Sequence, residues 1–187
     1  YGQVELKRVF DTFNLVAVCD LNEPAAEHVA AEAEEHLGTR PKVYTNLDEL
    51  LDREKGLDAV DIVTDPRAHH VAALKAFDAG VHVAVEKPLG VTVKACLRMI
   101  DGAKRSGLVL SVSENYRRDP MNRLVKSILE AEALGSPRLA LNVSASGTRG
   151  MPHSTAWRHI KLRGGYLLDY AVHNADLFLY FMGQVDR

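Results

Sequence analysis

Short runs of valine, alanine and isoleucine alternate with longer stretches of helical spacing along residues 14–112, and this alternation is the strongest constraint on the fold. The runs predict strands over 14–19, 42–44, 59–64, 81–85 and 108–112. The stretches between them predict helices over 24–37, 47–51, 67–79 and 92–105. Strands that alternate with helices connect through right-handed crossovers, which produce a parallel sheet covered on both faces. The sequence therefore predicts a doubly wound α/β fold.

The pattern changes after Arg118. The later segments predict a helix, a strand with one solvated face, and an apolar helix, over 119–133, 138–146 and 166–182. We therefore place a domain boundary near Arg118. Residues 1–118 form the α/β part, and residues 119–187 begin an α+β part.

Composition excludes several classes of function. The formal net charge of -2 provides no basic surface of the kind that nucleic-acid-binding proteins use. The apolar runs are shorter than a membrane span requires, and no stretch resembles a secretion signal. Cys19 and Cys96 are the only cysteines, and their spacing fits neither a zinc site nor a disulfide framework. We assign no metal, nucleic acid or membrane partner, and we expect a cytoplasmic protein.

A doubly wound nucleotide-binding domain begins with a strand, a glycine-rich turn and a helix whose N-terminus receives the pyrophosphate. Residues 1–10 resemble the end of that first helix, and they contain no GxGxxG turn. In the strand order 3-2-1-4-5-6, the strand before such a turn is the central one. The sequence therefore predicts a Rossmann-like sheet that lacks its first strand and glycine loop, with unpaired edges beside the gap, in a chain cut at both ends.

Asp20 directly follows the first predicted strand, where a dinucleotide-binding fold places the acid that binds the adenosine ribose. A carboxylate there accepts hydrogen bonds from the ribose hydroxyls and repels a 2′-phosphate. Leu21 and Asn22 follow, so no arginine or lysine stands next to it for that phosphate. Asp20 favours NAD over NADP, and the alternative is an acid that caps the following helix.

Glu86-Lys87-Pro88 follows the fourth predicted strand, at the edge where open parallel sheets bind ligands. A lysine at this position can hydrogen-bond a substrate hydroxyl and stabilise charge on its oxygen as hydride leaves the carbon. Pro88 can fix the turn, with a cis bond as one way to do so. The alternative is a solvated Glu-Lys pair before a turn.

Asp169 and His173 are four residues apart, so they lie on one face of the last predicted helix. Histidine transfers protons near neutral pH, and a neighbouring aspartate can fix its tautomer. The segment is otherwise apolar, so two ionisable groups on it require an explanation. The alternative is a capping aspartate and a packed histidine.

Together these segments resemble the glucose-fructose oxidoreductase, inositol dehydrogenase and rhizopine-catabolism (Gfo/Idh/MocA) family. The resemblance lies in VAVCD (16–20), AVDIVT (59–64), HHVAALKAFDAGVHVAVEKPL (69–89), SENYRRDP (113–120) and GGYLLDYAVHNADL (164–177). It implies an NAD-dependent oxidoreductase that acts on a sugar, cyclitol or similar polyol and forms homo-oligomers. The implied catalytic group is Lys87, Asp169 and His173. His173 exchanges the hydroxyl proton, Lys87 holds the reacting oxygen, and Asp169 orients them.

The same resemblance implies a domain for the dinucleotide (1–118) and a domain for substrate and oligomerisation (119–187). It also implies which residues lie around the ligands. Those that border the cofactor are Asp20, Thr64, Asp65, His69, Glu86, Lys87, Asn115 and, from the second domain, Arg158 beside Trp157. Tyr116, Arg117 and His153 lie on the substrate side. Asp65 stands where such proteins often have proline or asparagine, and Arg163 and Tyr170-Ala171 replace small residues, which predicts a narrower pocket floor.

Two alternatives to a working enzyme remain open from the sequence. The first is a dinucleotide-binding regulator or another non-catalytic relative, which keeps the fold without turnover. The presence of Lys87, Asp169 and His173 argues against it, because a regulator does not need these residues. An inactive truncation is the other, and the missing glycine loop favours it for the 187 residues taken alone. We expect the full-length protein to be a dehydrogenase that acts on CH–OH groups.

Overall fold

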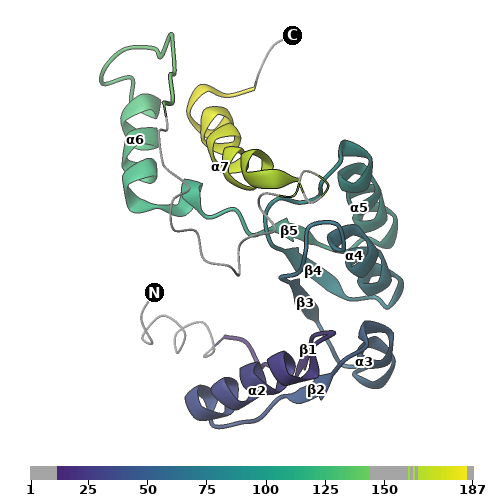
Figure 1. Cartoon of the computed structure of the whole chain (residues 1–187). Coiled ribbons are helices and arrows are strands. Elements are labelled where there is room, and N and C mark those ends of the chain that lie inside the picture. The colour runs from purple at the N-terminus through teal and green to yellow at the C-terminus, as the bar shows by residue number, and fades with distance from the viewer. Residues whose placement is uncertain (1–11, 144–159, 161, 163, 185–187) are drawn as a thin grey trace.

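The structure is a computed structural model that describes residues 12–143, 160, 162 and 164–184. Strands and helices alternate in its first part (Figure 1). The strands are β1 (Ala17–Cys19), β2 (Lys42–Tyr44), β3 (Ala59–Ile62), β4 (His82–Val85) and β5 (Leu110–Val112). The helices between them are α2 (Glu23–Leu37), α3 (Leu47–Arg53), α4 (His69–Asp78) and α5 (Val93–Ser106). Each strand and helix predicted along residues 14–112 is present, with ends that differ by a few residues.

The strands pair in parallel, but in the described residues they form two sheets rather than one. β1 pairs with β2, and β3, β4 and β5 pair in that order. In the part of the chain that the structure describes, β1 and β3 are not hydrogen-bonded to each other. The order 3-2-1-4-5-6 accounts for this division, because its strand 1 lies between the strands that correspond to β1 and β3. The predicted Rossmann-like α/β fold with parallel strands is confirmed, and in the described residues the two sheets adjoin where that order places its strand 1.

Capping residues set the ends of the helices. The Asn46 side chain accepts hydrogen bonds from two main-chain N–H groups at the start of α3, at 2.8 and 3.4 Å. Thr92 caps α5 in the same way, with its hydroxyl oxygen 3.2 Å from the N–H of Ala95. α2 ends at Gly38, whose φ of 76° is a left-handed conformation that glycine adopts without a steric penalty.

One apolar core joins the two sheets. It includes side chains of β2, α3, α4, α5 and the three-stranded sheet, and α3, α4 and α5 lie along one side of the strands with α2 on the other (Figure 1). Met99 of α5 and Val85 of β4 have no exposed surface. Gly102 allows α5 to approach α4 closely, because a Cβ atom there would lie 2.8 Å from Cδ2 of Leu74. The apolar core therefore connects the sheets although no pair of described strands does.

A polar cluster joins β2 to Glu54, the residue that follows α3. Nζ of Lys42 donates to Oε1 of Glu54 at 2.8 Å, and the Tyr44 hydroxyl donates to the same oxygen. The Glu54 side chain is 9% exposed. The hydrogen bonds from Lys42 and Tyr44 hold the pKa of the Glu54 carboxyl below its ordinary value of 4.5.

We expect the acid stability of the fold to depend on Glu54. A carboxylate with a lower pKa in the folded state stabilises the fold above its unfolded pKa, and this contribution is lost as pH falls through the folded pKa. Glu54→Gln should therefore remove part of the decrease in the free energy of unfolding between neutral pH and pH values below 4.5. Urea unfolding at a series of pH values measures this, with the exposed Glu35→Gln as control. The same acid dependence in Glu54→Gln and wild type would contradict the assignment.

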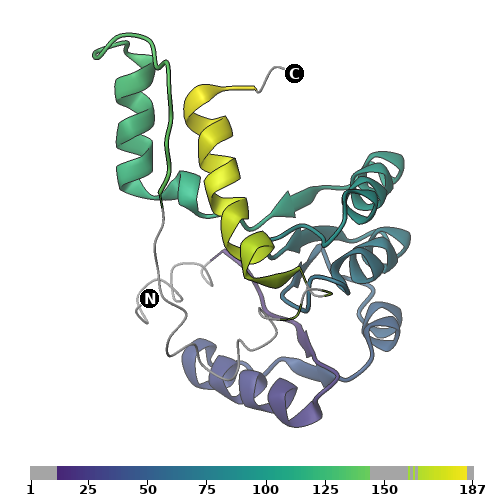
Figure 2. The same ribbon diagram turned by 45° about the horizontal axis from the view of Figure 1, so that its top comes forward.

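The second part of the described chain is helical. It contains the 3₁₀ turn η1 (Tyr116–Arg118), α6 (Pro120–Glu130) and α7 (Gly165–Met182), which contact one another. α7 begins beside the strands and runs away from them toward the far end of α6 (Figure 2). None of the helices in the described ranges is long and apolar enough to cross a membrane. The boundary near Arg118 coincides with η1 and stays a prediction.

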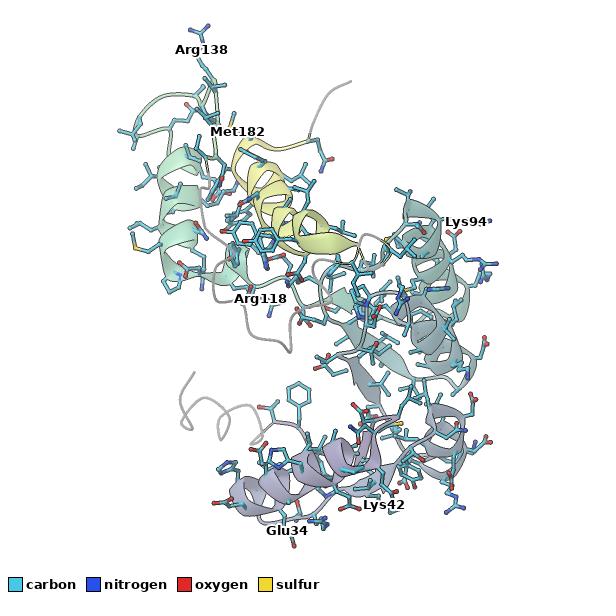
Figure 3. All side chains as sticks on the ribbon, in the orientation of Figure 1. Glu34, Lys42, Lys94, Arg118, Arg138 and Met182 are labelled. Carbon is cyan, nitrogen blue, oxygen red and sulfur yellow. The ribbon has the colours of Figure 1, made fainter. Side chains whose placement is uncertain are left out.

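The strand predicted over residues 138–146 is wrong for its described part, residues 138–143. Leu139, Leu141 and Val143 are about equally exposed, at 84, 81 and 79%. A strand needs a neighbour for its backbone hydrogen bonds, and no described strand pairs with this segment. The Arg138 side chain accordingly extends away from the ribbon beyond α6 (Figure 3). The helix end predicted in residues 1–10, like residues 144–146, lies outside the described residues.

Candidate active site

One loop and one helix bring the predicted catalytic residues together, and a second loop adds Glu114. Lys87 follows β4 and Glu114 follows β5, and the carboxyl ends of parallel strands meet at one edge of a sheet. α7 begins at this edge and carries Asp169 and His173 about one turn apart. These two residues are buried, with 6 and 7% of their surfaces exposed. Gly164, directly before α7, and Gly165, its first residue, have positive φ, a conformation that glycine adopts without a steric penalty.

Lys87 and Asp169 form a largely buried ion pair between the loop after β4 and α7. Nζ of Lys87 donates to Oδ1 of Asp169 at 2.8 Å and to the main-chain oxygen of Asp169 at 3.1 Å. The two side chains are 14 and 8% exposed. An ammonium group has three N–H donors, so this arrangement leaves one donor of Lys87 for the oxygen of a ligand.

His173 is held from the other side of the site, by Glu114. Its Nδ1 lies 2.8 and 2.9 Å from the two carboxylate oxygens of Glu114. The Tyr116 ring stacks on the imidazole, with centroids 3.9 Å apart and planes 8° apart. The sequence predicted that Asp169 orients His173. The structure pairs Asp169 with the Lys87 ammonium, and Glu114 reaches Nδ1 from the end of β5.

Arg117 connects η1 to α7. Its Nε donates to Oδ2 of Asp176 at 2.8 Å, and its Nη2 donates to Oδ1 of the same carboxylate. The hydrogen bond to Asp176 raises the pKa of Arg117 above its ordinary value. The guanidinium also lies over the ring of Tyr180, 5.4 Å from its centroid. Arg117 is thus engaged within the protein, and the predicted substrate contacts of Arg117 and Tyr116 stay predictions.

Most of the residues predicted to border the cofactor lie where strands end. Asp20 follows β1, Thr64 and Asp65 follow β3, Glu86 precedes Lys87 after β4, and Asn115 follows β5. Asp20, Thr64 and Asn115 are exposed, and the other two are half-buried. An extended dinucleotide binds across the carboxyl ends of such strands, so their placement fits this cofactor.

The aspartates of this group also hold the turns that precede two helices. Oδ1 of Asp20 accepts a hydrogen bond from the N–H of Asn22 at 2.8 Å, in the turn before α2. Oδ1 of Asp65 accepts from the main-chain N–H and from Nε of Arg67, at 3.0 and 2.9 Å, in the turn before α4. Asp20 therefore holds the turn before α2 but does not cap the helix, whose N-cap residue is Asn22, and its contact with a ribose stays a prediction.

His69 is fully buried and connects two of the loops. Its Nδ1 lies 3.1 Å from the main-chain oxygen of Pro88, and its Nε2 lies 3.1 Å from that of Thr64. The Lys87–Pro88 peptide bond in the second loop is cis. The covered imidazole therefore joins the loops after β3 and β4, and its place at the border of the cofactor stays a prediction.

The remaining predicted residues, His153, Trp157 and Arg158, lie outside the described residues. Glu114 is the residue of the site to which the sequence interpretation assigned no role, although it lies within the SENYRRDP segment. Its place directly after a predicted strand was the available signal, and the same signal identified Asp20 and Lys87. The site as described combines an ammonium, an imidazole and two carboxylates, which can bind a hydroxyl oxygen and move its proton.

Comparison with known proteins agrees with the fold described above. Residues 2–114, which include β1 to β5, match the model of the oxidoreductase family with an NAD-binding Rossmann fold. A 1,5-anhydro-D-fructose reductase from Ensifer adhaerens is 32% identical over 85% of this chain and 47% of its own length. The chain spans about half the length of the curated relatives it matches.

Solved structures show the same similarity. A myo-inositol 2-dehydrogenase from Lactobacillus plantarum is 27% identical, with a TM-score of 0.73 over 91% of this chain and 49% of that one. A levoglucosan dehydrogenase in complex with NADH and levoglucosan is 30% identical, with a TM-score of 0.69 over 90% of this chain and 45% of that one. The family match covers more than half of the chain and includes Asp20 and Lys87. The chain therefore belongs to the oxidoreductase family with an NAD-binding Rossmann fold, the Gfo/Idh/MocA family.

Proposed function

We propose that the whole protein is an NAD-dependent dehydrogenase that interconverts a secondary hydroxyl and a ketone on a sugar, cyclitol or similar polyol. The observation that carries the proposal is the buried Lys87–Asp169 pair beside His173, at the edge where this fold binds dinucleotides. The names of the relatives support the substrate class, since anhydrofructose, myo-inositol and levoglucosan are all polyhydroxylated small molecules.

Each of the catalytic residues has a distinct part in the proposed reaction. His173 accepts the hydroxyl proton at Nε2, because Nδ1 is bound to Glu114. Lys87 donates a hydrogen bond to the same oxygen and stabilises the negative charge that develops on it. Asp169 keeps the ammonium of Lys87 in place. The carbon–hydrogen bond breaks with its electron pair as the carbonyl forms, and bound NAD supplies the acceptor for that hydride.

The residues proposed to border NAD are those at the strand ends and one from the later part of the chain: Asp20, Thr64, Asp65, Glu86, Lys87, Asn115 and Arg158. The exposed carboxylate of Asp20 suits a pair of ribose hydroxyls. We propose NAD rather than NADP for the same reason, because a 2′-phosphate beside this carboxylate would be repelled.

The test is reduction of NAD by the whole protein with a panel of sugars and cyclitols, followed by nicotinamide absorbance. NADH binding is measured in parallel by fluorescence titration. Turnover with at least one polyol is the expected result. A folded protein that neither binds NADH nor reduces NAD with any of these substrates would exclude the proposal. NADH binding without turnover would favour a dinucleotide-binding regulator instead.

Cofactor preference provides a second prediction. Asp20→Ser combined with Leu21→Arg should shift the ratio of NAD to NADP affinity toward NADP by about 10- to 100-fold, since a hydrogen bond to a charged group contributes roughly 1.5–3 kcal/mol. Titration with both cofactors measures the ratio. Asp78→Ser, which removes an exposed carboxylate at the end of α4, is the control. An unchanged ratio in the double variant would refute the role of Asp20.

Three broader features are part of the same proposal. The chain divides near Arg118 into a dinucleotide-binding domain and the beginning of a domain for substrate and oligomerisation. The whole protein forms homo-oligomers, as the family resemblance implies. It works in the cytoplasm, where the free thiols of Cys19 and Cys96 stay reduced.

A further inference from the structure

The Glu114 carboxylate is fixed from two directions. Its Oε1 accepts a hydrogen bond from the main-chain N–H of Tyr116 at 2.9 Å, within the turn that follows β5. Both of its oxygens also face Nδ1 of His173, and the Glu114 side chain is 10% exposed. The carboxylate therefore cannot rotate away from the imidazole without losing a hydrogen bond to its own turn.

This contact determines which nitrogen of His173 carries the proton. A carboxylate only accepts hydrogen bonds, and a neutral imidazole has one N–H and one lone pair. With Nδ1 facing Glu114, the N–H lies on Nδ1 and the lone pair lies on Nε2. An imidazole that has no partner at Nδ1 favours the opposite tautomer, whose Nε2 cannot accept a proton.

Two aromatic rings hold the imidazole in the same orientation. Tyr116 stacks on its face at 3.9 Å, and Tyr170 approaches it edge-on, with centroids 6.3 Å apart and planes at 82°. Rotation of the His173 ring would break the stack and the hydrogen bond to Glu114 together. Glu114 and Tyr116 belong to one turn, so a single short segment after β5 sets both the plane and the tautomer of His173.

We propose that Glu114 is a positioning residue for His173, which it keeps in the tautomer with Nδ1 protonated and Nε2 ready to accept a proton. Asp169, by contrast, acts on Lys87. The inference rests on the proposed function for its catalytic meaning, because Nε2 is the atom that takes the substrate proton there. The tautomer itself is a property of the folded protein and can be measured without turnover.

The first experiment measures the tautomer of His173. The nitrogen chemical shifts of its imidazole are recorded at alkaline pH, where histidines are neutral, and are assigned by comparison with His173→Gln. Wild type and Glu114→Gln, which keeps an acceptor oxygen, should show the N–H on Nδ1. Glu114→Ala and Glu114→Met should shift the population toward the Nε2–H form, and Met preserves the side-chain volume if Ala prevents folding. Asp169→Asn should leave the tautomer unchanged. An Nδ1–H tautomer that persists without the carboxylate overturns the proposal.

The second experiment measures turnover by the same variants of the whole protein. Glu114→Met should lower kcat by about 100-fold, within the usual range for general acid–base catalysis, with partial recovery in Glu114→Gln. KM should change little, because Glu114 does not touch substrate. Glu35→Ala removes an exposed glutamate of α2 and serves as the control. A changed tautomer with unchanged kcat would also overturn the proposal. If wild type turns over no polyol, the proposed function fails, and the tautomer comparison alone decides the role of Glu114.

Discussion

Replacing Lys87 with methionine should lower kcat of the whole protein by about 10²- to 10³-fold, the usual cost of removing one donor that stabilises an oxyanion. Methionine keeps much of the length and apolar character of the lysine side chain but has no N–H to donate to the reacting oxygen. NADH affinity should fall much less, since Lys87 is one of several residues proposed at the cofactor edge. Steady-state kinetics and NADH titration measure the two effects separately.

The matched control for this variant is Lys75→Met. Lys75 also forms an ion pair, with Asp48, but the two side chains are 41 and 59% exposed, and neither residue belongs to the proposed site. Its loss should leave kcat unchanged. Because Lys87→Met also leaves Asp169 without its ammonium partner, the kinetics are measured at a temperature where circular dichroism shows the variant folded. If Lys87→Met turns over substrate at the wild-type rate, Lys87 has no catalytic role.

The alternation of strands and helices could be predicted from the sequence because local patterns determine it. The β-branched runs, the Asn46 cap and Gly38 each act over a few residues, and the structure contains each corresponding strand, helix start and helix end. The segment 138–143 shows the limit of such patterns. Its alternating leucines and valine are typical of a strand, but a strand also needs a partner, and the described residues provide none.

The site was partly predictable for a similar reason. Strand ends identified Lys87, and i, i+4 spacing placed Asp169 and His173 on one helical face. Local spacing does not determine which carboxylate pairs with the ammonium and which with the imidazole. Lys87 and Asp169 are 82 residues apart in the sequence, and Glu114 and His173 are 59 apart. Asp169 is closer to His173 along the chain, yet Nδ1 is bound to Glu114. The burial of His69 between two carbonyl oxygens likewise depends on how the loops after β3 and β4 fold together.

Asp169→Ala should be among the most destabilising single substitutions of the site. It would leave the Lys87 ammonium in a mostly buried position without its carboxylate, and breaking a buried ion pair from one side costs about 3–5 kcal/mol. We expect a value near the lower end, because the Lys87 side chain is 14% exposed and can still contact some water. Chemical denaturation followed by circular dichroism measures the free energy of unfolding of wild type and variant.

A double-mutant cycle separates the ion pair from the loss of packing. Lys87→Met combined with Asp169→Ala leaves neither charge unpaired, so the double variant should be less destabilised than the sum of the single variants, with a coupling of about 1–3 kcal/mol. The same cycle on the exposed pair, Lys75→Met with Asp48→Ala, should give a coupling of roughly 0–1 kcal/mol. Equal couplings for the two pairs would mean that Lys87 and Asp169 interact no more strongly than surface charges do. The buried pair would then not hold Lys87 in place for catalysis, and the proposed role of Asp169 would fail with it.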